Sequence, residues 1–399
     1  MSGKDGPTAG ADRPDTYVAA AGRRPEWTMG VVNPPVFRAS TIVYESVAAM
    51  DAAAANVDGT LFYGRKGTPT TWALREALTG LEPGAAGTML FPSGVAALSA
   101  GILAVARPGS HVLVPDSAYE PTASFLFGMA QDFGIEAQAY DPLIGAGIDA
   151  LIRPETALIL LESPGSLTFE VQDVPAICRV ARARGVATLL DNTWAASVFF
   201  KGIPAGCDMV MQALTKYVAG HSDAMMGSLS AGPGWFERVR RTAWALGQCV
   251  SGDEAALVLR GLRTLLVRLR QQEASALAIA RHLAAHPLVA CVRHPALPSC
   301  PGHASWQRDF SGSSGLFGFD LKVGTMADAG LFCDRMAHFR LGFSWGGYES
   351  LIIPARAVRR LPQPEPAPLR FRVSIGLEDP ADLLADLEAA LARLAQRYA

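Results

Sequence analysis

The sequence predicts an α/β fold: a mostly parallel central sheet with helices on both faces, followed by a smaller C-terminal α+β domain. In the first two thirds of the chain, short apolar runs such as 156–161 and 186–190 alternate with helical patterns. That alternation is typical of parallel strands covered on both faces. Beyond about residue 253 the alternation becomes irregular, with long helical stripes and a proline-rich stretch, which indicates a separate α+β domain.

One crossover unit is visible in the segment 156–190, where a strand, a helix and a second strand are expected in turn. Pro175 lies in the first turn of the expected helix, Asp173 just before it and Gly185 just after it. These residue types are typical of helix ends in these positions. Because apolar runs flank the helix, the segment fits a βαβ crossover between parallel strands.

Composition excludes several classes of protein. With 399 residues, 50% of them hydrophobic and 18% charged, the chain can bury a large core and form two domains. A net charge of -2 gives no reason to expect a nucleic-acid or anionic-membrane partner. The 6 cysteines show neither a CxxC pair nor zinc-ligand spacing, which favours reduced thiols and no metal site. Since a membrane-spanning run and a signal-peptide core are also missing from the sequence, we expect a cytoplasmic protein.

Two reactive side chains follow apolar runs. Asp191 comes directly after the run 186–190, and Lys216 follows the run 208–213. Ligands of open α/β sheets bind at the carboxyl ends of the strands, so both side chains are expected at that edge. A lysine and a carboxylate there suit pyridoxal 5'-phosphate (PLP). The amine condenses with the aldehyde, and the acid keeps the pyridine nitrogen protonated, so that the ring can accept electrons.

Lysine is scarce in this sequence, which narrows the choice of a cofactor-binding amine. Lys201, which follows two phenylalanines, is the only other lysine near the predicted site. A structural interpretation also remains open from these residues alone: Lys216 ends a strand, and Asp191 pairs with an arginine.

Three further segments carry groups suited to a phosphate or a flat ring. Ser93 and Gly94 open an expected helix, whose free N–H groups and dipole favour an anion. Tyr63 and Arg65 lie in a glycine-punctuated loop, and an arginine fork matches phosphate oxygens. Tyr119 follows a strand-like run and could stack on a ring. Taken singly, each pattern also fits a turn, a surface loop or a packing tyrosine without a ligand.

Eight short motifs occur along the chain in one order: FYGRKGTPT, FPSGVAAL, AYEPT, DNTWA, TKYVAGHSD, GLRTLLVR, SWGGYES and RVSIGLED. Each alone is weak, but together they are specific. They resemble the cysteine/methionine-metabolism family of PLP-dependent enzymes from about Val32 to the C-terminus. This resemblance implies the aspartate-aminotransferase type of fold (fold type I) and PLP as the cofactor.

The resemblance also implies roles for individual residues. Lys216 resembles the lysine that binds the cofactor aldehyde, and Asp191 resembles the partner of the pyridine nitrogen. Tyr119 resembles the tyrosine that stacks on the ring and takes part in catalysis. Gly94 and Val95 resemble the backbone cradle of the cofactor phosphate.

Four more positions concern the phosphate. Thr215 resembles the hydroxyl residue beside the lysine, while Tyr63 and Arg65 resemble residues that reach the phosphate of the neighbouring subunit. Active sites shared in this way imply a homotetramer built from dimers. Ala213 departs from the family pattern, because many members have serine there as a phosphate contact. We expect that contact to be missing here.

The expected domains follow from these assignments. Residues 1–62 are predicted to form an N-terminal extended arm, interrupted by Pro34 and Pro35 and suited to wrapping a partner subunit. Residues 63–256 are predicted to form the PLP-binding α/β domain, and residues 257–399 the C-terminal α+β domain.

Substrate binding is implied at the C-terminal domain. Arg372 resembles the arginine that binds the α-carboxylate of an amino-acid substrate, with Ser344 and Trp345 nearby. The motifs ESPGSLTFEV, DNTWAA, AYEPT and SWGGYES are most like those of bacterial cystathionine β-lyases. Relatives that act at Cγ usually show ESPxNP, DNTF and SLGGxES instead.

One position bears on whether the substrate is cleaved at Cβ or at Cγ. In γ-lyase relatives a glutamate commonly precedes the serine of SLGG and helps to hold the distal end of the substrate, but here that position is Phe343. An apolar wall of Phe343, Ser344 and Trp345 cannot pair with a distal ammonium in that way, which favours β chemistry.

The implied reaction is the β-elimination of cystathionine to homocysteine, pyruvate and ammonia, a transsulfuration step used in methionine biosynthesis. Lys216, Tyr119 and Asp191 would be its catalytic residues. Other activities of the same family remain alternatives: a broader cysteine-S-conjugate β-lyase, a cysteine desulfhydrase or a γ-lyase. A non-catalytic regulatory protein on the same fold is an alternative from a different class.

Overall fold

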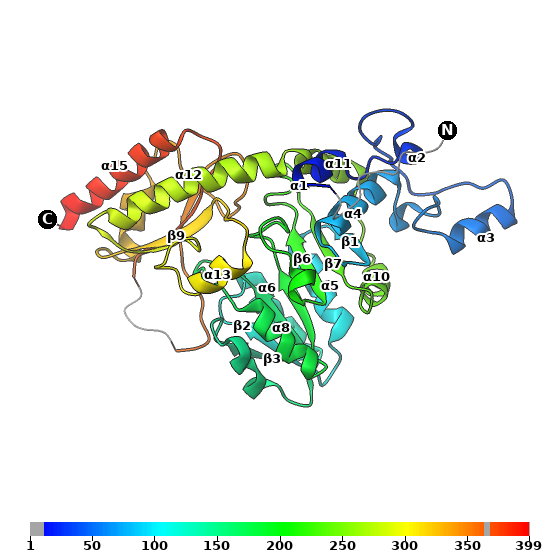
Figure 1. Ribbon diagram of the computed structural model, residues 1–399, viewed down its shortest axis with the longest axis horizontal. Helices are drawn as coiled ribbons and strands as arrows, with labels where there is room; N and C mark the ends of the chain where they lie inside the picture. The colour runs from blue at the N-terminus through cyan, green and yellow to red at the C-terminus, as the bar shows by residue number, and fades with distance from the viewer. Residues whose placement is uncertain (1–11, 363–367, 399) are drawn as a thin grey trace. The chain divides into compact units, whose positions relative to one another are not determined.

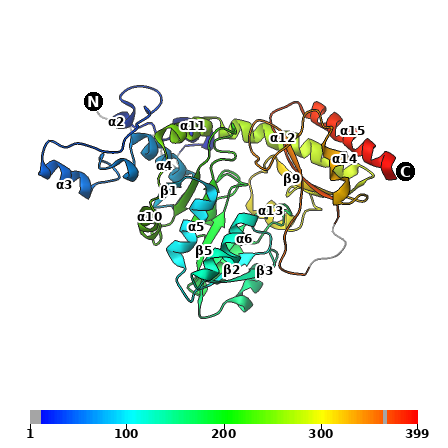
Figure 2. The same cartoon turned by 180° about the vertical axis from the view of Figure 1, so that it is seen from behind.

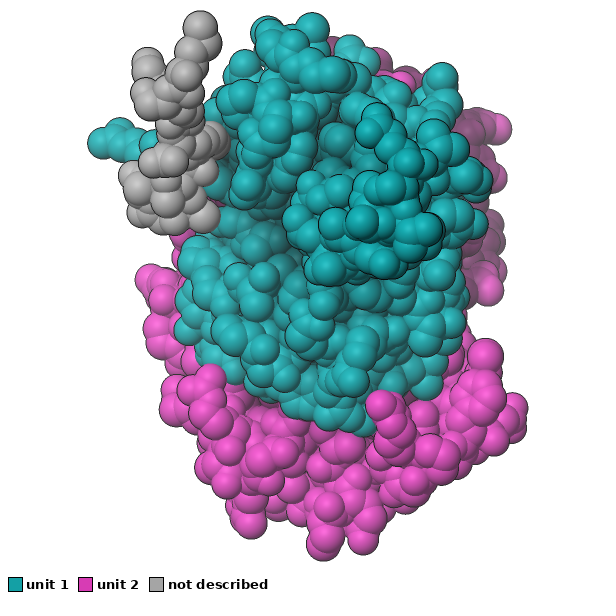
Figure 3. Space-filling view, turned by 90° about the vertical axis from the view of Figure 1, so that its right-hand side faces the viewer, with its two compact units in different colours: residues 1–105, 201–266 teal, residues 106–200, 267–399 magenta. Residues whose placement is uncertain are grey.

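The computed structural model describes residues 12–362 and 368–398. The chain divides into two compact units, one formed by residues 1–105 and 201–266 and the other by residues 106–200 and 267–399 (Figure 3). The first eleven residues of the predicted arm lie outside the described residues. The domain boundaries predicted at residues 62 and 256 stay predictions.

The first unit contains three antiparallel strands. Its strands are β1 (Gly87–Phe91), β6 (Met209–Ala213) and β7 (Gly227–Ala231). They run in the order β1-β7-β6, and both pairs are antiparallel. Its longer helices are α4 (Pro69–Leu81), α5 (Gly94–Val105), α10 (Phe236–Ala245) and α11 (Gly252–Arg263). Because α4 packs on β1, and α5 packs on β6 and β7, the strands are buried along most of their length.

The N-terminal segment is more ordered than the sequence predicts. It contains the short helices α1 (Pro14–Ala20), α2 (Pro25–Thr28) and α3 (Val47–Ala55), and the single turn η1 (Gly64–Lys66). Proline in the first turn starts α1 and α2, while the Ser46 hydroxyl caps α3 by accepting the Ala49 N–H at 3.1 Å. The residues from Val31 to Ser46 form neither a helix nor a strand, and α3 follows them at the tip of a long loop (Figures 1 and 2).

The second unit contains the parallel strands. They are β2 (His111–Pro115), β3 (Glu136–Tyr140), β4 (Thr156–Glu162) and β5 (Ala187–Asp191), in the order β5-β4-β2-β3. All three pairs are parallel. Their helices are α6 (Glu120–Phe127), α7 (Met129–Asp132) and α8 (Val174–Ala183). The crossover predicted over 156–190 is confirmed as β4, α8 and β5, and the Asp173 side chain caps α8 by accepting the Ala176 N–H at 3.0 Å.

The C-terminal part of the second unit is the smaller α+β domain that was predicted. Its five strands are β8 (Val289–Arg293), β9 (Leu316–Leu321), β10 (Arg340–Leu341), β11 (Leu351–Pro354) and β12 (Arg370–Ser374), in the order β10-β11-β12-β9-β8. Its helices are α12 (Leu265–Ala285), α13 (His303–Asp309), α14 (Ala329–Cys333) and α15 (Pro380–Tyr398).

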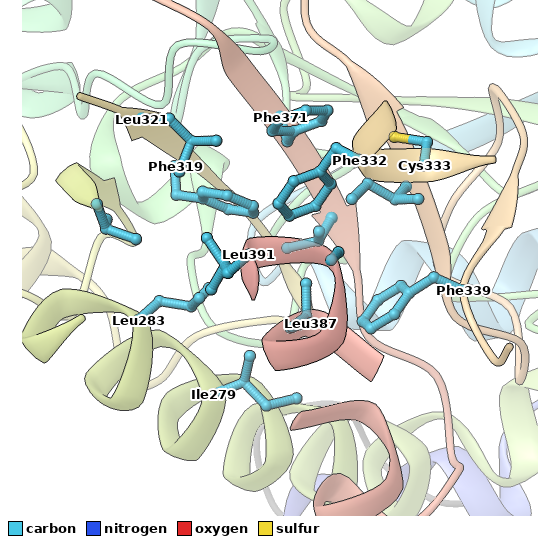
Figure 4. Close-up of a cluster of buried hydrophobic side chains, with 14 of the residues drawn as sticks. Ile279, Leu283, Phe319, Leu321, Phe332, Cys333, Phe339, Phe371, Leu387 and Leu391 are labelled. Atoms are coloured by element: carbon cyan, nitrogen blue, oxygen red, sulfur yellow. The ribbon is translucent and has the colours of Figure 1, made fainter. Parts of the chain in front are cut away.

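An aromatic cluster forms the core of this domain (Figure 4). Phe332 and Phe371 stack with their ring centroids 4.4 Å apart, and the ring centroid of Phe319 lies 5.5 Å from that of Phe371. Leu387 and Leu391 of α15 cover the cluster and are also buried. The domain therefore has a core of its own, built from β9, β12, α14 and α15. In the part of the chain that the structure describes, no helix is both long enough and apolar enough to span a bilayer.

Candidate active site

In the first unit, strand β1 leads directly into the amino end of helix α5. The Ser93 hydroxyl accepts the Ala96 N–H at 3.1 Å, and the Ser93 carbonyl accepts the Ala97 N–H at 3.1 Å. The N–H groups of Gly94 and Val95 have no acceptor among residues 12–362 and 368–398. They are the first-turn donors that an α-helix leaves unpaired, and the helix dipole makes their surroundings favourable for an anion.

The backbone at the start of α5 lies unusually close to the two neighbouring strands. A Cβ atom added to Gly94 would lie 2.8 Å from the Cβ of Ala213, the last residue of β6. A Cβ atom on Gly227, at the start of β7, would lie 2.3 Å from the Ser93 carbonyl oxygen. Glycine is therefore required at both positions. The helix start thus exposes bare backbone donors, which fits a phosphate cradle.

Lys216 lies in a turn just beyond the same end of β6. Its N–H donates to the Ala213 carbonyl at 3.1 Å, and its carbonyl accepts the Gly220 N–H at 2.8 Å. The neighbouring Thr215 hydroxyl accepts the Met226 N–H at 3.0 Å and lies 3.2 Å from the Met226 carbonyl. These bonds fix the backbone of Thr215 and Lys216 beside the strand end that Gly94 approaches.

Lys201, the other lysine considered, lies at the opposite end of β6. Its ammonium donates to the Leu81 carbonyl at 2.8 Å, close to where α4 ends and before β1 begins. Burial lowers the pKa of this amine. The position favours Lys216 over Lys201 as the amine at the ligand-binding edge of the sheet.

Tyr63 and Arg65 flank a tightly held turn in the first unit. The Gly64 N–H donates to the Ser40 carbonyl at 2.8 Å, and a Cβ atom on Gly64 would lie 1.9 Å from the Ala39 carbonyl oxygen. Tyr63 is 43% exposed, and Arg65 is exposed with one N–H donated to the Trp244 carbonyl at 3.0 Å. The turn therefore presents both side chains at the surface of its own unit.

In the second unit, two carboxylates end adjacent parallel strands. Asp191 is the last residue of β5 and pairs in register with Glu162, the last residue of β4. Asp191 accepts the Thr193 N–H at 3.0 Å and the Thr193 hydroxyl at 2.5 Å. Glu162 accepts the Tyr119 N–H at 2.7 Å. The sheet thus brings Tyr119, Glu162 and Asp191 together at its carboxyl edge.

Glu162 was not among the site residues predicted from the sequence. Its signal was the same as that of Asp191: an acidic residue directly after a buried apolar run. Burial and the neighbouring Asp191 raise the pKa of the Glu162 carboxyl well above its usual range. Burial raises the pKa of the Tyr119 phenol, with Asp191 and Glu162 acting in the same direction and Arg372 opposing them. Tyr119 therefore stays a neutral phenol at neutral pH.

Arg372 is buried on β12 and holds the loop that carries Ser344 and Trp345. One guanidinium nitrogen donates to the carbonyls of Gly342, Phe343 and Ser344 at 3.2, 3.1 and 3.0 Å. The positive charge of Arg372 also lowers the pKa of the Tyr119 phenol, which shows that the two side chains interact electrostatically. Ser344 and Trp345 are half-buried, whereas Phe343 is 88% exposed, so only two of the three residues of the predicted apolar wall are covered.

Groups of the kinds that PLP requires occur in both units. The first unit carries backbone N–H groups suited to a phosphate, with a lysine and a threonine at the same strand end. The second unit carries a carboxylate suited to a pyridine nitrogen, Asp191, and its charge and that of Arg372 both act on the Tyr119 phenol. The residues present fit the cofactor.

A family model supports the same conclusion. The model described as "Cys/Met metabolism PLP-dependent enzyme" matches residues 15–392. The chain belongs to this Cys/Met metabolism family. Because the family depends on PLP, that cofactor is expected here.

Individual members of the Cys/Met metabolism family match along nearly the whole chain. The chain is 46% identical over 391 residues to "Cystathionine beta-lyase MetC" of Escherichia coli (strain K12), covering 95% of this chain and 98% of that protein. It is 46% identical over 389 residues to "Cystathionine beta-lyase" of Salmonella typhimurium, covering 95% and 98%. A crystal structure of cystathionine gamma synthase from Xanthomonas oryzae pv. oryzae aligns with a TM-score of 0.88, at 30% identity, over 96% of this chain and 99% of that one. The fold is fold type I, as predicted.

Proposed function

We propose that this protein is a PLP-dependent carbon–sulfur β-lyase that cleaves cystathionine to homocysteine, pyruvate and ammonia in methionine biosynthesis. The observation that carries this proposal is the 46% identity, over 95% of the chain, to the two curated proteins named as cystathionine beta-lyases. The site residues support it, because the chain retains an amine, a carboxylate, a phenol and an arginine suited to this chemistry.

When bound, PLP supplies an aldehyde for the substrate amine and a ring that accepts the electrons of the broken Cα–H bond. Lys216 holds the cofactor between turnovers and takes the α-proton of the substrate. Asp191 keeps a proton on the pyridine nitrogen, and the two hydrogen bonds from Thr193 orient its carboxylate for this task. The N–H groups of Gly94 and Val95, with the Thr215 hydroxyl, bind the phosphate.

Tyr119 would face the ring of bound PLP and, as a neutral phenol, would donate a proton to the departing thiolate. Arg372 binds the α-carboxylate of the substrate, while the loop that it holds lines the site with Ser344 and Trp345. Phe343 replaces an acidic side chain and so removes one means of holding a distal ammonium, which supports cleavage at Cβ.

Tyr63 and Arg65 act on the phosphate bound to a neighbouring subunit, which makes a dimer the smallest active unit. The protein forms a homotetramer built from such dimers, and it acts in the cytoplasm. The exposure of Tyr63 and Arg65 in a single chain supports this part of the proposal.

One experiment separates the proposed reaction from its alternatives. The purified PLP-bound protein is incubated in parallel with cystathionine, cystine and homocysteine, and the keto acid formed from each is identified. The proposal expects pyruvate and homocysteine in equal amounts from cystathionine, with much slower turnover of the other two compounds. Release of 2-oxobutyrate from cystathionine would identify a γ-lyase, and fastest turnover of cystine would identify a broader β-lyase or a desulfhydrase. Bound cofactor with no keto acid would indicate a regulatory protein.

A further inference from the structure

A buried arginine of the smaller C-terminal domain reaches the carboxyl edge of the parallel strands in the second unit. Arg359 lies in the segment 355–362, just after β11, and its side chain is only 10% exposed. One guanidinium nitrogen forms an ion pair with Glu170, and another lies 3.8 Å from a carboxylate oxygen of Asp116. The side chains of Asp116 and Glu170 are themselves nearly covered, at 1% and 12% exposed. Arg359 therefore connects three segments of the second unit that lie far apart in the sequence.

Backbone contacts hold the same segment in place. The two carboxylate oxygens of Asp116 accept the Arg360 N–H at 2.7 Å and the Leu361 N–H at 3.3 Å. The guanidinium carbon of Arg360 lies over the ring of Phe127, 4.0 Å from its centroid. Asp116 directly follows β2, and Phe127 ends α6. The segment is thus attached to the chain both before and after Tyr119.

A turn of residues 116–119, called the Tyr119 turn below, packs closely on a neighbouring loop that ends at Glu170. The Ser117 carbonyl accepts the Ser166 N–H at 2.8 Å. A Cβ atom on Gly165 would lie 2.4 Å from the Ser117 hydroxyl oxygen, so the loop and the turn are in tight contact. Within the loop, the Glu170 carbonyl accepts the Gly165 N–H at 2.9 Å. The arginine thus contacts the first residue of the Tyr119 turn and the last residue of the loop that packs on it.

Loss of the Arg359 side chain would leave two nearly buried carboxylates without the guanidinium that contacts both. A buried charge that loses its partner is strongly destabilising, so the backbone around it must shift or admit water. Because Asp116 lies only three residues before Tyr119, this movement displaces the phenol. A displacement of about 1 Å in a reacting group can reduce a rate about a hundredfold.

We propose that Arg359 is a positioning residue for catalysis. By joining Asp116 to Glu170, it fixes the Tyr119 turn and so the place from which the phenol donates its proton. The inference rests on the proposed function, since Tyr119 has the task of a proton donor only in that reaction. Arg359 acts through the two carboxylates and the turn, and not on the substrate.

Hydrogen exchange of the PLP-bound protein, measured by mass spectrometry, tests the effect on the turn. The variants are Arg359→Ala, Arg359→Lys and, as the matched control, Arg356→Ala, which removes an exposed arginine from the same segment. Arg359→Ala should speed exchange in peptides that cover 116–120 and 163–170 and leave β9 unchanged. Arg359→Lys should restore part of the protection, because an ammonium keeps the charge without the fork of the guanidinium. Unchanged exchange in 116–120, or equally faster exchange that includes β9, would overturn the proposal.

Steady-state kinetics with cystathionine test the effect on the reaction. Arg359→Ala should lower kcat about tenfold to a hundredfold, because the proton donor is displaced. KM should change little, because Arg372 still binds the substrate carboxylate. Arg356→Ala should keep both values. An unchanged kcat for Arg359→Ala, or a rise in KM alone, would show that Arg359 does not position the phenol.

The pH dependence of kcat separates positioning from a loss of stability. Burial raises the pKa of the Tyr119 phenol; the charges of Asp191, Glu162 and Glu120 raise it further, and that of Arg372 lowers it. A displaced turn admits water to the phenol, so its pKa falls and the alkaline limb of kcat moves to lower pH in the alanine variant. Lower stability alone reduces the amount of folded enzyme and leaves that limb in place, which would contradict the proposal.

Failure of this inference is distinguishable from failure of the proposed function. If the unaltered protein releases no pyruvate from cystathionine, the proposed function is wrong and the role given to Arg359 is wrong with it. If the unaltered protein releases pyruvate, while Arg359→Ala keeps its exchange rates and its kcat, the inference alone is wrong.

Discussion

Glu162 and Asp191 stand side by side at the ends of two parallel strands, and Glu162 also accepts the backbone N–H of Tyr119 at 2.7 Å. Two carboxylates so close cannot both ionise without mutual repulsion. The raised pKa of Glu162 means that the neutral form of this carboxyl is favoured in the folded protein. Glu162 therefore supports the backbone of Tyr119, while burial and the charge of Asp191 disfavour its ionised form.

Glu162→Gln should remove a pH dependence of stability. A carboxyl whose pKa is raised on folding stabilises the protein at low pH, and this stability is lost as the pH rises from the ordinary glutamate pKa through the folded value. Compared with the unaltered protein, the variant should therefore become relatively more stable as the pH rises from about 5 to about 8. Denaturant unfolding at the two pH values measures this, with the exposed Glu120→Gln as control. A constant difference at both pH values would rule out the raised pKa.

Lys216→Ala should lose both turnover and the visible absorbance of lysine-bound PLP, because the amine that binds the cofactor and takes the α-proton is gone. Loss of a proton-transfer residue alone typically reduces rates about 10²–10⁴-fold. Absorbance spectra and pyruvate release measure the two effects. Lys201→Ala is the matched control and should keep the absorbance. If the absorbance disappears with Lys201→Ala and persists in Lys216→Ala, the assignment moves to Lys201.

Asp191→Asn should nearly abolish elimination and leave the fold intact. The amide oxygen can still accept the Thr193 N–H, so the local hydrogen bonds are largely kept. The neutral amide does not hold a proton on the pyridine nitrogen, so the ring accepts electrons less readily. Pyruvate release reports activity, and circular dichroism with thermal unfolding reports the fold. Persisting activity would refute the role given to Asp191.

Arg372→Leu should chiefly raise KM, because the guanidinium that binds the substrate carboxylate is lost. A hydrogen bond to a charged group contributes about 1.5–3 kcal/mol, which corresponds to about tenfold to a hundredfold in affinity. Arg372→Lys should restore little of it, because a single ammonium does not match the fork of the guanidinium. Steady-state kinetics with cystathionine measure KM and kcat separately. An unchanged KM would exclude Arg372 from carboxylate binding.

Gly94→Ala should weaken the binding of PLP. The added Cβ atom would lie 2.8 Å from the Cβ of Ala213, so the start of α5 must shift away from β6 and its N–H groups would move. Gly234→Ala is the control, because a Cβ atom there meets nothing within 4 Å. The dissociation constant of PLP, measured by fluorescence titration of the apoprotein, should rise for the first variant alone. Equal constants for both variants would show that the start of α5 does not hold the phosphate.

The main elements of the fold could be predicted from apolar runs and helix-end residues. Strands β4, β5 and β6 and helix α8 lie where those patterns placed them. Helix α3 was missed because its alanine-rich sequence shows no apolar stripe, and its start depends on one hydrogen bond to Ser46. Glu162 was missed because an acidic residue at a strand end equally fits a simple boundary. Only its register with Asp191 shows that the two are neighbours.

The contacts of Arg372 depend on the folding of the C-terminal domain and could not be predicted from spacing. The arginine donates to carbonyls about thirty residues earlier in the chain, because β11 and β12 pair antiparallel and bring the preceding loop beside it. Periodicity identifies strands but does not give their partners or register. The carboxylate-binding role was implied by resemblance alone, and the three carbonyl contacts are new information from the structure.

The close approach of Gly94 and Gly227 to their neighbours has a practical consequence for engineering. Any side chain at either position would collide with the backbone or with Ala213, so natural drift and designed libraries alike have almost no freedom there. Differences in substrate preference must then arise at positions that tolerate substitution, such as the exposed Phe343. A library that holds the two glycines constant and randomises Phe343 and its neighbours would retain cofactor loading while sampling new substrates.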